Sequence, residues 1–257
     1  MLVTGASGGI GAAAAAAFLE NGDTVYGLSR RAEAPAGVTA IACDETDDAS
    51  VQSAVGRVLA EQGRIDVLVN NAGFGISGAA EFTSTAAMHR QFDVNFFGMA
   101  RCTRAVLPAM RAQGAGRILN LSSVAAALPI PFQAFYSAVK AAVSAFSLAL
   151  QNEVRPYGIR VSALLPGDVK TGFTAAREKS GAGADVYPAM ARSVAGMERD
   201  EQGGMAPAAI GKRLLAISKK KRPKGLYSCG LQYQFFLFLA RALPVRLSNW
   251  IVGKMYA

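Results

Sequence analysis

The chain has 257 residues, a length that suits one α/β domain with a sizeable buried core. Its apolar runs are all shorter than the ~18 residues that a membrane-spanning helix needs, and its first residues lack the features of a secretory signal. Three widely spaced cysteines and a single histidine argue against a disulfide framework, a metal site and a Ser-His-Asp triad. We therefore expect a cytoplasmic protein with free thiols and no metal.

The net charge of +9 is unevenly distributed along the chain. Residues 202–257 hold ten Lys or Arg and no Asp or Glu, whereas the rest of the chain is close to neutral. A basic tail of this kind indicates an anionic partner, such as a lipid surface or a phosphate-bearing ligand, or else a solvated basic face. No nucleic-acid-reading motif accompanies it, so we do not expect nucleic-acid binding.

The first predicted strand, Leu2-Val3, leads into the glycine-rich sequence T-G-A-S-G-G-I-G at Thr4–Gly11. An alanine-rich helix follows to about Glu20. Glycines let the backbone approach a pyrophosphate, and a helix N-terminus supplies N–H groups and a positive dipole. The sequence therefore predicts a dinucleotide phosphate site whose residues are Gly5, Ser7, Gly9, Ile10 and Gly11.

The second predicted strand, Asp23–Ser29, ends about twenty residues after the glycine loop. An NAD site places a carboxylate at this point, against the ribose 2′-hydroxyl. Here the chain instead has Ser29, Arg30 and Arg31. Two guanidinium groups without a carboxylate suit a 2′-phosphate, so the sequence favours NADP over NAD.

The third predicted strand, Val38–Cys43, ends in two carboxylates, Asp44 and Glu45. A carboxylate at this position is able to accept a hydrogen bond from the adenine amino group of the cofactor. Helical periodicity follows over residues 48–62.

The fourth predicted strand, Asp66–Asn70, is followed by small residues that leave room for a ribose, and the first of them supplies hydrogen bonds. These residues are Asn71, Ala72 and Gly73. A long helix is then predicted from about residue 85 to 110, with Asn95 near its middle.

The fifth predicted strand, Arg117–Leu121, leads to Ser122 and Ser123, and the next helix carries Tyr136 and Lys140 one turn apart. A lysine ammonium beside a phenol lowers the phenol pKa from about 10 toward the working pH, as a general acid/base requires. A serine hydroxyl aimed at the same point holds a carbonyl oxygen as charge develops on it. Ser123, thirteen residues before Tyr136, is the candidate for this role.

The sixth predicted strand, Ile159–Leu165, completes a regular alternation of strands and helices. This order predicts an α/β fold, a doubly wound (Rossmann) parallel sheet of about seven strands with helices on both faces. The candidate ligand-binding residues all follow strand C-terminal ends, where such sheets bind ligands. We expect one domain over residues 1–257, with a substrate lid at about 172–212 and a C-terminal helical extension at about 231–257.

Taken together, these motifs resemble the short-chain dehydrogenase/reductase family, in its type of about 250 residues with an Asn-Ser-Tyr-Lys tetrad. The resemblance covers residues 1 to about 175 and rests on the family's order and spacing. Its matches are Thr4–Gly11, N-N-A-G at Asn70–Gly73, Asn95, Ser123, Y-S-A-V-K at Tyr136–Lys140 and P-G-D-V-K-T at Pro166–Thr171.

The resemblance implies a role for each member of the tetrad. Tyr136 is implied to be the acid/base, and Lys140 to lower the tyrosine pKa and bind the nicotinamide ribose. Ser123 is implied to position the substrate oxygen, because it has the family spacing to Tyr136, so Ser122 is expected to be structural. Asn95 is implied to hold a water in a proton relay. Arg30 lies where NADP-preferring members carry a basic residue, although Gly8 replaces the second basic residue that many of them have. Further cofactor contacts are implied at Pro166, Gly167, Val169 and Thr171.

Family-level analogy indicates an NADP(H)-dependent oxidoreductase acting on a secondary alcohol or ketone. The substrate is expected to be lipophilic, as in the branch that handles hydroxysteroids and retinoids. The alternatives are a reductase of β-ketoacyl thioesters and a non-catalytic NADP-sensing or membrane-docking protein. For the apolar C-terminal extension we consider three roles: a cover over the substrate cleft, a contact with a second subunit, or a contact with an anionic membrane surface. A homodimer built on the two long helices after strands four and five is the family expectation.

Overall fold

The computed structural model, which describes residues 1–256, contains one sheet of seven parallel strands and confirms the predicted doubly wound fold. Most of the strands are buried on both faces, which explains their continuous apolar sequences. In spatial order the strands are β3 (Thr39–Ala42), β2 (Tyr26–Ser29), β1 (Leu2–Thr4), β4 (Val67–Asn70), β6 (Gly116–Leu121), β7 (Ile159–Leu165) and β9 (Leu226–Ser228).

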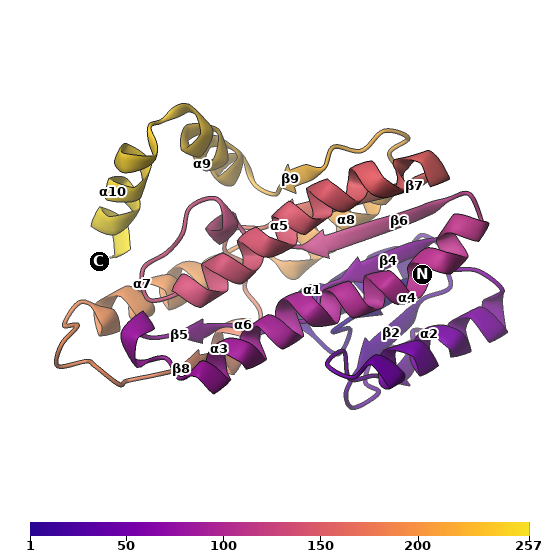
Figure 1. Ribbon diagram of the computed structural model, residues 1–257, viewed down its shortest axis with the longest axis horizontal. Coiled ribbons are helices and arrows are strands. Elements are labelled where there is room, and N and C mark those ends of the chain that lie inside the picture. The colour runs from indigo at the N-terminus through magenta and orange to yellow at the C-terminus, as the bar shows by residue number, and fades with distance from the viewer. Residues whose placement is uncertain (257) are drawn as a thin grey trace.

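Helices cover both faces of the sheet, and each face has its own apolar core (Figure 1). The first core is formed with α2 (Asp48–Gln62), α4 (Met99–Ala112) and α5 (Ala134–Val154). The second is formed with α1 (Gly9–Glu20) and α8 (Pro207–Ser218). α1 and α8 pack closely, because a Cβ atom at Gly211 would lie only 2.3 Å from the Ala13 carbonyl oxygen.

The strand order reverses at β1, which pairs with β2 on one side and with β4 on the other. The chain therefore builds the sheet outward in both directions from this point. Loops leaving the carboxyl ends of β1 and β4 diverge to opposite faces, which opens a crevice between them. This crevice is where the predicted glycine loop and the predicted ribose-binding loop meet.

The predicted long helix over residues 85–110 is interrupted. It consists of α3 (Thr85–Phe92), a π-helical turn at Asp93–Gly98 and α4. A π-helical turn shifts the backbone hydrogen bonds by one residue, which apolar periodicity does not reveal. A second small sheet of β5 (Ile76–Ser77) and β8 (Glu178–Lys179) was also not predicted, since two-residue strands have no readable periodicity.

Beyond β7, the predicted lid range 172–212 contains α6 (Phe173–Ala176), β8, α7 (Met190–Gln202) and the start of α8. The predicted extension 231–257 forms α9 (Leu231–Ala242) and α10 (Val245–Tyr256), and its last residue, 257, lies outside the described residues. Figure 1 shows α9 and α10 as a yellow pair beside α7. Within residues 1–256, none of the helices has the length and apolarity needed to cross a membrane.

Candidate active site

A cavity of about 1150 Å³ runs along the carboxyl edge of the sheet. Every predicted cofactor residue except Gly11 lines it. The lining set is Gly5, Ser7, Gly9, Ile10, Ser29, Arg30, Arg31, Asp44, Glu45, Asn71, Ala72, Gly73, Tyr136, Lys140, Pro166, Gly167, Val169 and Thr171. Residues that are far apart in the sequence therefore contribute to one site.

The glycine loop has the shape of an anion-binding turn. Gly5 and Gly9 adopt positive φ angles of 64° and 54°, which side-chain-bearing residues rarely adopt. α1 begins at Gly9 after Gly8, with no acidic residue in its first turn, so its N-terminal dipole is not neutralised. Gly11 has a packing role instead, because a Cβ atom there would lie 2.1 Å from the Gly5 carbonyl oxygen.

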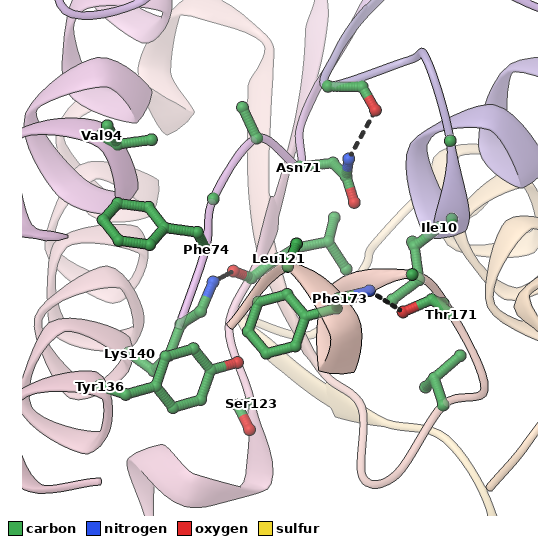
Figure 2. Close-up of a pocket in the computed structure, with 18 of the residues that line it drawn as sticks. Ile10, Asn71, Phe74, Val94, Leu121, Ser123, Tyr136, Lys140, Thr171 and Phe173 are labelled. Atoms are coloured by element: carbon green, nitrogen blue, oxygen red, sulfur yellow. Dashed lines mark hydrogen bonds between the residues drawn. The ribbon is translucent and has the colours of Figure 1, made fainter. Parts of the chain in front are cut away.

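Asn71 joins the loop after β4 to the glycine loop. Its side-chain nitrogen donates to the carbonyl oxygens of Thr4 at 3.0 Å and Gly5 at 3.3 Å, and Figure 2 shows the amide directed toward the first loop. The amide nitrogen, which the sequence assigned to a ribose, is thus bonded to the protein backbone. Its role here is to fix the crevice between β1 and β4.

The arginine end of the cavity follows β2. Arg30 and Arg31 are both exposed and both line the cavity. Arg31 pairs with Glu33 at 3.1 Å, an exposed ion pair that a stronger anion is able to displace. The Ser29 hydroxyl holds this turn by bonding both the N–H and the carbonyl of Glu33, at 2.9 and 3.0 Å.

Glu45 is a buried carboxyl at the same end of the cavity. It is 7% exposed, and its Oε1 atom has no hydrogen-bond partner among the described residues. Burial raises its pKa to about 7. The pKa of the Cys102 thiol is raised mainly by burial and further by the Glu45 charge. The carboxyl therefore lies close to the core under α4 as well as to the cavity. The sequence did not predict that it would be buried.

The predicted catalytic side chains meet at the opposite end of the cavity. The Ser123 and Tyr136 side chains lie next to one another (Figure 2), and the Ser123 hydroxyl favours the phenolate form of Tyr136. The Lys140 ammonium is buried and donates to the Leu121 carbonyl oxygen at 2.8 Å. Ser122 has the structural role expected, since its hydroxyl donates to the Lys140 carbonyl oxygen at 2.8 Å and so joins β6 to α5.

The acid–base properties differ from the sequence prediction in one respect. Burial raises the pKa of Tyr136 to about 12, and the hydrogen bond from Ser123 lowers it only in part. Burial also lowers the pKa of Lys140 to about 8. The expected lowering of the tyrosine pKa by lysine is therefore wrong for the protein alone, because desolvation of the phenol dominates.

Asn95 differs from the other three members of the tetrad because it is not among the residues that line the cavity. It is buried in the π-helical turn, where its Nδ2 donates to the Phe74 carbonyl at 2.8 Å and its Oδ1 accepts from the Phe74 N–H at 3.0 Å. The Asn95 side chain thus holds the loop after β4 through two hydrogen bonds to the Phe74 backbone. Its predicted role in holding a water stays a prediction.

The model of the short chain dehydrogenase family matches residues 1–181. The chain belongs to this family. Over its whole length it is 41% identical to "3-ketodihydrosphingosine reductase" of Bacteroides thetaiotaomicron, covering 97% of that protein. The chain is therefore an oxidoreductase of the class that interconverts CH–OH groups and ketones.

Two solved structures of short-chain dehydrogenases show the same architecture. One, from Streptomyces avermitilis, is 36% identical with a TM-score of 0.86, over 98% of this chain and 96% of its own. The other, a 3-ketoacyl-(acyl-carrier-protein) reductase from Brucella melitensis complexed with NADH, is 27% identical with a TM-score of 0.75, over 90% of this chain and 95% of its own.

The dehydrogenase has further residues at the reacting end that were not predicted. The Phe173 ring lies 5.7 Å from that of Tyr136, and the Arg177 guanidinium lies 5.5 Å from the Phe173 ring. Arg177 is buried and pairs with Glu201, which lines the cavity. Asp168 is part of the motif at Pro166–Thr171, but the sequence did not assign it a role. Phe173, Arg177 and Glu201 belong to none of the motifs, so the sequence alone did not indicate them.

Proposed function

We propose that this dehydrogenase uses NADPH to reduce the ketone of a long-chain lipid of the 3-ketodihydrosphingosine class. The observation that carries the proposal is the convergence of Ser123, Tyr136 and Lys140 on one end of the dinucleotide cavity. The full-length similarity to a 3-ketodihydrosphingosine reductase supports the substrate class. Steroid ketones and retinaldehyde, which represent the hydroxysteroids and retinoids first expected from the sequence, become the comparison substrates.

The cavity fits NADP(H). The close approach of Gly5, Gly9 and the α1 N-terminus leaves backbone N–H groups free for a pyrophosphate, and Arg30 and Arg31 supply two cations for a 2′-phosphate. Lys140 would hold the nicotinamide ribose, with Thr171 and the Pro166–Val169 segment beside the nicotinamide. When bound, the cofactor supplies the hydride.

The acid–base properties suit reduction. A tyrosine with a pKa of about 12 keeps its proton at neutral pH, so it is available to protonate the oxygen of a ketone as the carbinol forms. The Ser123 hydroxyl, which lies beside Tyr136, would hold that oxygen. A buried Lys140 ammonium with a pKa of about 8 remains mostly charged at neutral pH and stabilises the phenolate left behind.

The test is NADPH consumption by the purified protein with four carbonyl substrates. These are 3-ketodihydrosphingosine, a steroid ketone, retinaldehyde and a β-ketoacyl thioester. The proposal expects turnover of the long-chain amino ketone at a kcat/KM at least tenfold above the others. A higher kcat/KM for the thioester, or for the steroid or retinoid, would contradict the substrate class.

A β-ketoacyl thioester reductase is the second candidate. It is supported by the similarity to the Brucella melitensis reductase and by the basic residues 202–257, which suit an acidic carrier or a phosphate. A non-catalytic NADP sensor is disfavoured, because a protein that only binds the cofactor has no need for a serine, a tyrosine and a lysine arranged around one point.

The C-terminal pair α9 and α10 supports the expected contact with an anionic membrane. Their large apolar side chains are exposed, at 57% for Phe235, 64% for Phe238 and 59% for Trp250, among Arg and Lys without any acidic residue. Cosedimentation with anionic but not with zwitterionic vesicles is the expected result. A homodimer through α4 and α5 also stays a prediction.

A further inference from the structure

Asp168 is held beside the predicted catalytic serine. It follows β7 in the segment Pro166-Gly167-Asp168, and the Val124 N–H next to Ser123 donates to the Pro166 carbonyl oxygen at 3.0 Å. Asp168 lines the same cavity as Ser123 and Tyr136. The turn that carries the serine and the segment that carries this carboxylate are therefore directly connected.

The Asp168 side chain is also fixed in place by α9. The Tyr233 hydroxyl donates to Asp168 Oδ2 at 2.7 Å. The Tyr233 ring lies directly over Gly167, where an added Cβ atom would come within 2.1 Å of the ring. A carboxylate whose segment and side chain are both constrained is preorganised to bind a ligand.

The charge of Asp168 is not neutralised by the protein. The other two carboxylates on this side of the cavity have guanidinium partners, Glu201 with Arg177 and Glu178 with Arg90. Within residues 1–256, Asp168 makes no ion pair. Burial is the main cause of the raised pKa of Tyr136, and the Asp168 charge adds a smaller contribution in the same direction.

We propose that Asp168 binds the ammonium group of a 2-amino ketone substrate, an inference that rests on the proposed function. In such a substrate the amine is on the carbon next to the ketone. When the ketone oxygen lies at Ser123 and Tyr136, the ammonium is one carbon away, beside the segment that β7 delivers. A half-buried carboxylate without a cationic partner there gains a charge-assisted hydrogen bond only from a cationic substrate.

Selectivity then follows from the unpaired charge. A neutral ketone of the same length would leave Asp168 desolvated and without a partner, which lowers its affinity. Steroid ketones and retinaldehyde have no amine, so they do not use this contact. Asp168 thus determines specificity, whereas Tyr136 and Ser123 serve any ketone that reaches them.

The test compares two long-chain ketones that differ in one group, 3-ketodihydrosphingosine and its analogue with hydrogen in place of the amine. In the wild-type protein, kcat/KM is expected to be roughly tenfold or more higher for the amino ketone. Asp168→Asn, which keeps the shape of the side chain, is expected to remove this preference, because kcat/KM for the amino ketone should fall much further than kcat/KM for the amine-free ketone.

Two control variants separate recognition from a structural role. Tyr233→Phe removes the hydrogen bond to Asp168 but keeps the charge, so it should retain most of the preference. Asp200→Asn removes a carboxylate of α7 and should leave the preference intact. An equal loss on both ketones in Asp168→Asn would overturn the inference. Equal wild-type activity on both ketones would overturn it while the proposed function stands, and no turnover of either ketone would overturn both.

Discussion

The two ends of the cavity are built in different ways. The nucleotide end consists mostly of backbone, from the glycine loop and the loop after β4, together with two exposed arginines. The reacting end consists of side chains: Ser123 from the turn after β6, Tyr136 and Lys140 from α5, and Asp168 after β7. Phe173 and Tyr233 complete it from segments beyond the matched motifs.

This difference indicates which measurable property each end of the cavity controls. Backbone N–H groups and exposed cations bind a cofactor that many enzymes share, so that end depends on loop shape and on net charge. The reacting end depends on buried groups whose pKa values are set by desolvation, so small changes there have large effects on rate. Changes at the nucleotide end should alter affinity and stability, and changes at the reacting end should alter turnover.

The largest effect is expected for Tyr136→Phe. The phenylalanine ring keeps the contact with Phe173 but has no proton to give, so kcat should fall about 10²- to 10⁴-fold. The dissociation constant for NADPH, measured by fluorescence titration, should change little. Turnover within threefold of the wild type would remove Tyr136 from the proposed mechanism.

Glu45 should make the stability of the nucleotide end depend on pH. Its pKa is raised by burial from 4.5 to about 7 in the folded protein, so its contribution to stability is full below pH 4.5 and is lost as the pH rises through 7. By pH 8 the loss is on the order of 3 kcal/mol. In Glu45→Gln, the free energy of unfolding in urea should lack this decline.

Asp44→Asn is the matched control for Glu45. The Asp44 pKa is lowered, chiefly by hydrogen bonds from Thr46, so its stabilising contribution is present above the unfolded pKa and disappears only as the pH falls below it. The Asn variant should therefore keep the decline between pH 4.5 and 7. A Glu45→Gln profile parallel to that of the wild type would contradict the assignment.

Gly11→Ala tests the shape of the glycine loop. The added Cβ atom would lie 2.1 Å from the Gly5 carbonyl oxygen, so the loop must move, at a cost of about 1–3 kcal/mol in stability. The affinity for NADPH should fall with it. Gly8→Ala is the control, because no atom lies within 4 Å of the position of its Cβ. If both variants behaved alike in thermal unfolding and titration, packing at Gly11 would not be the cause.

The smallest effect is expected for Arg30→Asp, because Arg30 is exposed. The carboxylate should repel a 2′-phosphate and accept from a ribose hydroxyl, shifting the ratio of kcat/KM for NADPH over NADH by roughly tenfold toward NADH. The matched charge reversal Arg155→Asp lies on the surface near the end of α5 and should leave the ratio unchanged. An unchanged ratio in both variants would mean that Arg30 does not select the cofactor.

The sequence was sufficient for the sheet and for most of the cavity lining. Short apolar strands, each followed by small or polar residues, place their loops at one edge, and this rule alone brings Gly5, Asn71 and Ser123 together. The helix at 48–62 and the strand Ile159–Leu165 have the predicted bounds. Agreement between several local signals made these predictions secure.

The remaining features depend on contacts that local patterns do not contain. The turn that buries Asn95 is π-helical, so its backbone hydrogen bonds span one more residue than those of an α-helix. The hydrogen bond of Tyr233 to Asp168 joins residues 65 positions apart. The Tyr136 pKa follows from how completely the surrounding chain removes water from the phenol. Such quantities depend on the assembled site and not on the spacing of Tyr136 and Lys140.

The most direct test of the account is to follow the hydrogen that should pass from the nicotinamide to the ketone carbon at the reacting end of the cavity. Purified protein would be supplied with 3-ketodihydrosphingosine and NADPH deuterated at the transferable position of the nicotinamide, and the product would be analysed by mass spectrometry. The account predicts a carbinol with one deuterium on the former ketone carbon, and none formed by Tyr136→Phe on the same timescale. A carbinol without deuterium, or equal product from the variant, would contradict it.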